Sequence, residues 1–215
     1  MNNLKFLAGM LVFGSLWGFS ECIIGPLFSD AGLPSGMIMT GFFALTFLVL
    51  SRRIYPHYGM QAGMGLIAGS LRMINPFGGC HLCSALAIMA EGMIFEVIFY
   101  STTTFDFENL NSWTNKIGLG IVSAYTVYVG GYIITQILTP LTYGQFYIQN
   151  LIAMMPQYLA RGLPVAFIGA ITVPFTLSIT NVKLNLKDAW YYPATLGISA
   201  FCWIFVIANW FIFTM

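Results

Sequence analysis

Charged side chains are scarce in this sequence. Only 7% of its 215 residues are Asp, Glu, Lys or Arg, whereas average soluble domains carry roughly 25%. So few charges cannot cover the surface of a soluble protein. Hydrophobic residues make up 58% of the chain, and the mean hydropathy is +0.81. Lipid must therefore be the solvent for much of the molecule.

Other absences exclude whole classes of function. No basic run is present that could follow a phosphate backbone, so we expect no nucleic-acid partner. The chain has no Walker A, kinase or hydrolase-elbow motif and cannot hydrolyse ATP by itself. Its two histidines, His57 and His81, fall on opposite sides of the membrane in the topology predicted below. A bis-histidine haem is therefore not expected, and no bound cofactor is predicted.

The sequence contains several long apolar segments that could span a membrane. A spanning helix needs about 20 mostly apolar residues. Seven segments qualify or nearly do: Leu4–Ile24, Gly36–Leu50, Tyr58–Ile74, His81–Tyr100, Ile117–Leu138, Tyr158–Ile179 and Pro193–Phe213. The second and third are short, and Gln145–Met155 reads as a short interfacial helix before Pro156. The predicted fold class is an all-α, polytopic membrane helix bundle, with residues 1–215 forming one integral domain.

The few basic residues predict the orientation, because cytoplasmic loops hold the excess of Lys and Arg. With the N-terminus in the cytoplasm, the cytoplasmic positions are Lys5, Arg52, Arg53, Lys116, Lys183 and Lys187. Arg72 and Arg161 then fall near the outer face, and the C-terminus lies outside the cell (plasma or inner) membrane. The unusual polar residues gather on the same outer side, which indicates a site that opens outward.

Glu91 lies near the middle of the fourth predicted helix, where a carboxylate is costly in hydrocarbon. It should therefore face the bundle interior, as a ligand-binding residue or as a paired structural one. Glu96 is about 140° away around the helix, at roughly 100° per residue, and should not share its site. It could instead touch a partner protein. Trp17 and Glu21 are four residues apart and share a helix face, which suits a small ligand with a flat or cationic part.

The most informative stretch runs from Arg72 to His81. Pro76 and the following glycine pair end one helix and permit irregular backbone, which membrane proteins tolerate where it lines a cavity. We predict a binding loop there, with an ordinary tight hairpin as the alternative. Arg72 would meet an anionic group, Asn75 would hydrogen-bond the ligand, and His81 would line the site. Arg161 is a further candidate for binding.

Three readings remain open for Cys80, His81 and Cys83. The two thiolates and the imidazole form a soft metal-ligand set, while Cys-x-x-Cys at a helix N-terminus suits redox chemistry. Otherwise the cysteines only pack. Gly14 and Gly18 form a small-residue face, which predicts either docking of a separate membrane subunit or internal packing.

The arrangement resembles the substrate-binding S component of energy-coupling factor importers of vitamins and metals, over about Leu4–Ile179. A local likeness to the cobalt/nickel-type S components covers Met73-Ile74-Asn75, Gly78-Gly79 and His81-Leu82, followed by the small-residue run from Ser84 to Ala87. The chain begins Met1-Asn2, however, and lacks the Met-His start of the metal-specific members. The resemblance makes residues 1–180 the core and residues 193–213 an added helix.

That resemblance implies a non-enzymatic binding subunit for high-affinity uptake of a vitamin, cofactor precursor or metal-containing ligand. It also implies outer loops at Pro26–Ser35 and Asn75–Cys80 that cap and line the pocket. The partners would be a transmembrane coupling subunit, docked through Gly14 and Gly18, and two ATPase subunits. Two alternatives remain: a membrane thiol-disulfide oxidoreductase using Cys80 and Cys83, and a non-catalytic assembly subunit of a membrane complex.

Overall fold

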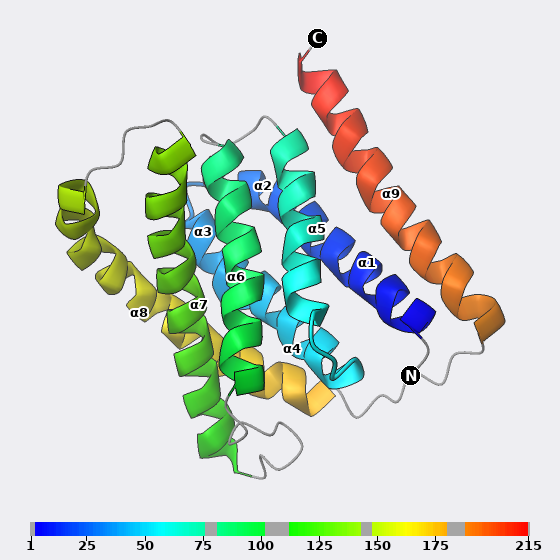
Figure 1. Cartoon of the computed structure of the whole chain (residues 1–215), viewed down its shortest axis with the longest axis horizontal. Coiled ribbons are helices and arrows are strands. Elements are labelled where there is room, and N and C mark those ends of the chain that lie inside the picture. Colours follow the sequence, from blue (N-terminus) through cyan, green and yellow to red (C-terminus); the bar gives the residue numbers. More distant parts are fainter. Residues whose placement is uncertain (1–2, 76–80, 102–111, 143–147, 180–187, 215) are drawn as a thin grey trace.

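The computed structural model describes residues 3–75, 81–101, 112–142, 148–179 and 188–214, and within these ranges all regular structure is helical (Figure 1). The helices are α1 (Asn3–Phe19), α2 (Gly25–Asp30), α3 (Ser35–Ile38), α4 (Leu45–Ile54), α5 (Met60–Ile74), α6 (His81–Ser101), α7 (Trp113–Thr142), α8 (Ile148–Ile179) and α9 (Asp188–Thr214). The π-helical segments η1 (Ser20–Ile24) and η2 (Met39–Ala44) join α1 to α2 and α3 to α4 without a break. The predicted all-α class is confirmed.

Six helical stretches in the described ranges are long and apolar enough to cross a membrane. They are Asn3–Asp30, Ser35–Ile54, Leu82–Phe99, Trp113–Pro140, Ile148–Ile179 and Trp190–Ile212. These stretches correspond to six of the seven predicted spans. They make the chain an integral membrane protein, because apolar helices of this length match the thickness of a bilayer.

The remaining predicted span, Tyr58–Ile74, is the shorter helix α5. Its 15 residues cover about 22 Å at 1.5 Å per residue, less than the roughly 30 Å of a hydrocarbon core. At its start, the Glu96 carboxylate of α6 accepts hydrogen bonds from the backbone N–H groups of Gly59 and Ala62. At its end, Arg72 donates to Ser84 near the start of α6. Helix α5 therefore runs antiparallel to α6 and carries the chain between the two ends of the bundle.

Basic residues gather at one end of the bundle, as the sequence predicts. Arg52 donates through Nη2 to the carbonyl of Phe99 at 3.2 Å, and Arg53 through Nη1 to the carbonyl of Leu177 at 3.0 Å. These bonds tie the end of α4 to the ends of α6 and α8. Helix α1 begins at this end, while α9 finishes at the opposite one (Figure 1). We call the first the basic end and the second, where α2 and α3 meet, the cavity end.

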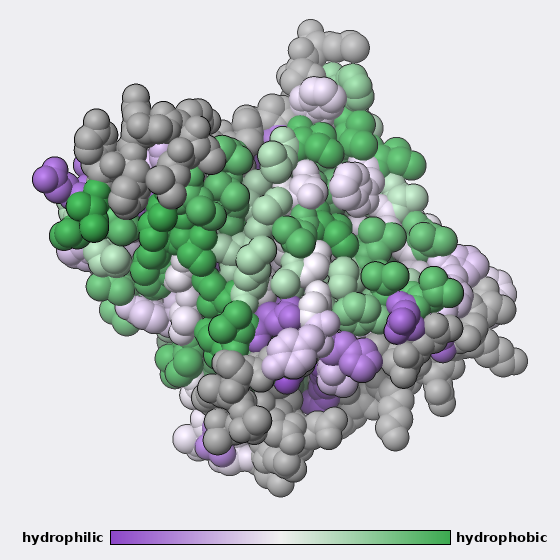
Figure 2. All heavy atoms as spheres, viewed as in Figure 1, coloured by the Kyte–Doolittle hydropathy of each residue, from purple (hydrophilic) through white to green (hydrophobic). Residues whose placement is uncertain are grey.

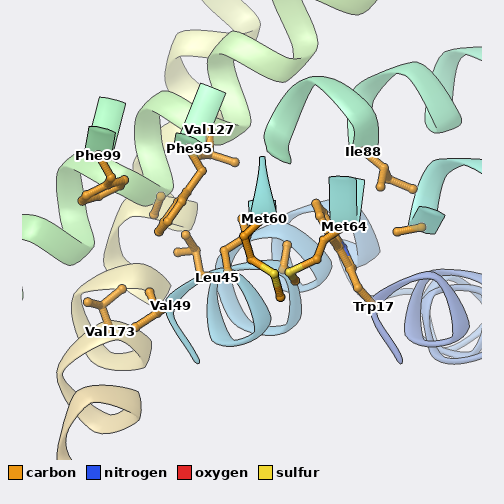
Figure 3. Close-up of a cluster of buried hydrophobic side chains, with 14 of the residues drawn as sticks. Trp17, Leu45, Val49, Met60, Met64, Ile88, Phe95, Phe99, Val127 and Val173 are labelled. Atoms are coloured by element: carbon orange, nitrogen blue, oxygen red, sulfur yellow. The ribbon is translucent and has the colours of Figure 1, made fainter. Parts of the chain in front are cut away.

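Close helix packing builds the core. Trp17, Met60, Met64 and Phe95 are fully buried in one cluster that joins α1, α5 and α6 to α4, α7 and α8 (Figure 3). Glycine permits the close approach: a Cβ on Gly92 would lie 2.5 Å from a backbone oxygen of α5. Small residues at helix contacts are typical of membrane bundles, where burial from water does not drive helix association.

The outer surface around the middle of the bundle is apolar. Figure 2 shows hydrophobic side chains across much of the visible face, with hydrophilic ones concentrated toward the basic end. Leu66, Val97, Val122 and Ile204 are among the exposed hydrophobic residues of α5, α6, α7 and α9. Such a surface would be an aggregation hazard in water, but it is the surface that lipid requires.

Several predicted boundaries are wrong. Pro156 does not separate an interfacial helix from a span, since α8 runs unbroken from Ile148 to Ile179 with three prolines inside it. Proline can kink a helix without ending it, and Figure 1 shows α8 changing direction after its first turns. The predicted outer loop Pro26–Ser35 is helical as far as Asp30 and again from Ser35. Of Asn75–Cys80, residues 76–80 lie outside the described ranges.

The small-residue face of α1 packs inside the chain. Gly14 and Gly18 are both buried, and a Cβ on either would come within 3 Å of α5 atoms, those of Ile67 and of Ala68 and Leu71 respectively. This corrects the docking prediction in favour of its alternative, internal packing, because α5 already occupies the surface that a separate subunit would need.

Candidate ligand-binding cavity

Two adjoining cavities, of about 200 and 180 Å³, lie toward the cavity end of the bundle. Glu21, Gly36, Met39 and Ser84 line both, so the two cavities form one site with two compartments. The inner compartment reaches the middle of α6 and is completed by Thr40, Ala87, Ile88, Glu91, Tyr128 and Tyr132. The outer compartment lies under α2 and α3 and is completed by Gly25, Pro26, Ser29, Ser35 and Arg72.

Glu91 lines the inner compartment. Its side chain is 6% exposed, and Oε1 accepts a hydrogen bond of 2.7 Å from the Thr40 hydroxyl. Oε2 is buried and has no hydrogen-bond partner. A Cβ on Gly131 of α7 would lie 3.0 Å from Cγ of Glu91, so glycine at that position leaves room for the carboxylate. An unsatisfied buried carboxylate oxygen is costly, and a ligand donor would satisfy it.

Arg72 lines the outer compartment near the end of α5. It is 5% exposed, and Nε donates to the Ser84 hydroxyl at 3.0 Å. Nη1 is buried and makes no hydrogen bond. A guanidinium presents its donors in a fixed planar fork. The bond to Ser84 therefore fixes the orientation of the side chain and leaves a donor for an acceptor in the compartment.

Glu21 stands where the compartments meet, and Trp17 holds it there. The indole Nε1 of Trp17 donates to Oε1 of Glu21 at 3.3 Å, which agrees with the shared helix face expected from their spacing. Trp17 itself is fully buried in the core cluster and is not among the residues that line the two compartments. Its predicted role as an aromatic wall is therefore replaced by that of a donor that positions Glu21.

Both π-helical segments border the cavity. Glu21 belongs to η1, while Met39 and Thr40 belong to η2. A π turn inserts an extra residue into an α-helix and changes the direction of the side chains around it, and such turns are frequent at functional sites. Here the two turns place a carboxylate and a hydroxyl on the same cavity from different helices.

Three predicted binding residues lie elsewhere or are not described. Asn75 is buried, and its amide donates to the carbonyl of Cys22 at 2.7 Å, so it anchors η1 to the end of α5. Arg161 lies on an exposed part of α8 and is not among the residues lining either compartment. The backbone at His81 begins α6, but its side chain lies outside the described part of the structure.

Of the three residues Cys80, His81 and Cys83, the structure describes the side chain of Cys83. Cys83 is disulfide-bonded, whereas Cys22 and Cys202 are free and buried. A disulfide sulfur is not a thiolate ligand, so Cys83 in this state does not serve the predicted metal set. Cys80 and the His81 side chain, the other members of that set, are not described. Within the described residues, no group of three or more His, Cys, Asp or Glu side chains is placed to hold a metal ion.

Several residues that line the cavity do not stand out in the sequence. Thr40, Tyr128 and Tyr132 contribute a hydroxyl and two aromatic walls to the inner compartment. Tyr128 and Tyr132 are four residues apart on α7, a spacing that places them on one helix face. That pair was a usable signal. Thr40 gave none, because single hydroxyl residues are common in membrane helices and bond to their own backbone.

Fold and cavity together define an integral membrane helix bundle with a partly open site between its helices, lined by Glu21, Arg72 and Glu91. Comparison with family models, with curated proteins and with solved structures found no match to the chain. Function must therefore be inferred from the site itself.

Proposed function

We propose that this protein is a substrate-binding membrane subunit for uptake of a small molecule, working in the manner of the energy-coupling factor S components. The supporting observation is the cavity, in which Glu91 and Arg72 each keep a buried polar atom without a partner. Buried polar atoms are normally satisfied. Two of opposite charge around one cavity fit a site that is completed by a ligand.

The proposal includes an orientation. The basic end would face the cytoplasm, following the positive-inside rule, and the cavity end would face outward. Ser29 and Gly36 are exposed beside the outer compartment, which gives a ligand from outside a route of entry. The C-terminus would then lie outside the plasma or inner membrane.

Uptake would require partners. The chain carries no ATP-hydrolysing motif, so energy would come from a transmembrane coupling subunit with two ATPase subunits. Because α5 covers the Gly14 and Gly18 face, such a subunit would dock on the lipid-facing surface of another helix. In this proposal the protein binds and delivers its ligand and catalyses no reaction.

Native mass spectrometry of the gently purified protein tests ligand binding. We expect a small molecule to co-purify at close to one per chain and to be lost from Glu91→Gln. Arg161→Gln is the matched control, since it also removes a charge but lies outside the cavity lining, and it should retain the molecule. If every preparation is empty and a supplied metabolite extract adds no mass, the binding function is wrong.

Cysteine labelling tests the orientation. A Cβ at Gly36 meets no atom within 4 Å, so Gly36→Cys should accept a thiol without disturbing the packing. A membrane-impermeant thiol reagent added to intact cells should label Gly36→Cys and spare Ser112→Cys, which precedes α7 at the basic end. The opposite pattern would invert the topology.

Cys83 supports a second candidate function. Its disulfide-bonded state is what the thiol oxidoreductase hypothesis for Cys80 and Cys83 requires. That hypothesis predicts that the bond is reduced reversibly, which mass-tagged thiol labelling would measure. It also predicts that Cys83→Ser loses dithiol oxidation whereas Cys22→Ser does not. If the protein oxidises no dithiol, the disulfide is a structural bond and the oxidoreductase hypothesis is wrong.

A further inference from the structure

The cavity separates its charges along its length. Glu91 and the two tyrosines line only the inner compartment, Arg72 lines only the outer one, and Glu21 stands at their junction. From this separation we infer that the ligand is a small zwitterion, bound with its cationic group toward Glu91 and its anionic group toward Arg72. This inference depends on the proposed binding function and specifies its substrate class.

The inner compartment favours a cation. Oε2 of Glu91 is a buried acceptor with no donor, and Glu21 places a second carboxyl group in the same compartment. A cationic group supplies the missing donor and interacts favourably with both carboxyl groups. The faces of aromatic rings also attract cations. Tyr128 provides a ring in the wall, while Tyr132, which also lines it, is stacked on Tyr158.

The outer compartment combines the Arg72 guanidinium with the Glu21 carboxyl group, and the guanidinium keeps a donor for an anion. Nη1 of Arg72 is a buried donor with no acceptor, while Nε is held by Ser84. Ser29 and Ser35 bring hydroxyl donors to the same compartment. A carboxylate could accept from the guanidinium and a hydroxyl together, which is the charge-assisted geometry that makes such bonds strong.

The two volumes limit the size of the ligand. The two compartments together, at about 200 and 180 Å³, reach only the lower end of the roughly 300–1,000 Å³ of sites for drug-sized molecules. A compact molecule with an amine at one end and a carboxylate at the other fits this shape. A large planar cofactor would exceed either compartment.

Three matched probes test the charge requirement: δ-aminovalerate, n-pentylamine and valerate, which share a chain length and differ only in their charged ends. We expect δ-aminovalerate to bind the detergent-purified wild-type protein at least tenfold more tightly than either single-ended probe. Thermal stabilisation across a concentration series measures this, because a ligand that binds only the folded state raises its stability. Shorter and longer ω-amino acids then locate the best charge separation.

Two variants assign the ends. Glu91→Gln should lower the affinity for δ-aminovalerate at least tenfold and leave the affinity for valerate unchanged. Arg72→Lys keeps a positive charge and protects folding, but its ammonium lacks the planar fork, so it should weaken valerate and leave n-pentylamine unchanged. If Arg72→Lys does not fold, Ser84→Ala tests the same end by releasing the guanidinium.

The outcomes separate this inference from the proposed function. If n-pentylamine or valerate binds as tightly as δ-aminovalerate, the zwitterion inference is wrong although the cavity still binds ligands. A co-purifying molecule that is neutral or carries one sign of charge would overturn it in the same way. If no ω-amino acid binds and no molecule co-purifies, both proposals fail together.

Discussion

Two glutamates on α6, five residues apart, have opposite surroundings. Glu96 accepts hydrogen bonds from two backbone N–H groups at the start of α5, whereas Glu91 has one oxygen bonded to Thr40 and the other unsatisfied beside a cavity. Both are buried, at 9% and 6% exposure. Burial of a carboxylate in an apolar helix is therefore not evidence of a binding site; the evidence is an oxygen that the protein leaves without a donor.

The largest expected effect is the loss of Glu96. Glu96→Ala removes the acceptor of two half-buried backbone donors, which should cost about 2–4 kcal/mol of stability. The measurement is thermal unfolding of the detergent-purified protein, and ligand affinity of the remaining folded fraction should be unchanged. An unaltered unfolding temperature would contradict the structural role assigned to Glu96.

The same conservative change at both positions sharpens the comparison. Glu91→Gln should leave the unfolding temperature unchanged or raise it, because it removes a buried carboxyl oxygen that has no hydrogen-bond partner while Thr40 can still donate to the amide oxygen. Glu96→Gln should lower it, since one of the two N–H groups then faces an amide NH₂. In ligand affinity the order reverses: Glu91→Gln should lose roughly tenfold, about 1.4 kcal/mol. Equal behaviour of the two variants would remove the distinction.

A smaller effect is expected from the glycine behind Glu91. Gly131→Ala places a methyl group 3.0 Å from Cγ of Glu91, so the carboxylate must move by a few tenths of an ångström. We expect a loss of ligand affinity of roughly threefold, about 0.6 kcal/mol. Gly118→Ala, where a Cβ meets no atom within 4 Å, is the control on the same helix. If both variants bind alike, the position of Glu91 does not depend on Gly131.

The smallest effect is expected at Arg161. It lies on the exposed part of α8, so Arg161→Gln should change unfolding temperature and ligand affinity by less than about 0.5 kcal/mol, the usual range for surface substitutions. A titration beside the wild-type protein checks this. A tenfold loss of affinity would return Arg161 to the binding site, where the sequence analysis placed it.

Charge scarcity explains which site residues the sequence could reveal. Glu21, Arg72 and Glu91 stand out because each is a charge in an apolar helix, and all three line the cavity. Asn75 and Trp17 also stand out as polar groups in apolar segments, but they hold the lining residues in place and do not line the cavity. The sequence does not show which way a polar group turns. Whether such a group meets a ligand or the backbone depends on contacts between distant segments, such as Asn75 with Cys22.

The helical architecture was accessible for a similar reason. Apolar length alone predicts the six long stretches, and the short length of α5 was visible in Tyr58–Ile74. The unbroken course of α8 could not be predicted. Whether a proline ends a membrane helix or only kinks it depends on the groups that pack beside it. The π turns could not be predicted from the sequence, because tertiary packing determines where the backbone hydrogen bonds shift to the wider π register.

The two π turns also bear on how this site could arise or disappear. Because a π turn accommodates one additional residue, deleting a single residue within Ser20–Ile24 would restore a regular helix. Because the π turn takes up the extra residue within one turn, α1 and α2 would keep their relation to each other. The side chains of the turn itself, Glu21 among them, would change direction, and the carboxylate would leave the junction of the two compartments. The loss of one codon could thus remove the site without disturbing the bundle, and the history of the site would be recorded in the lengths of the first two spans.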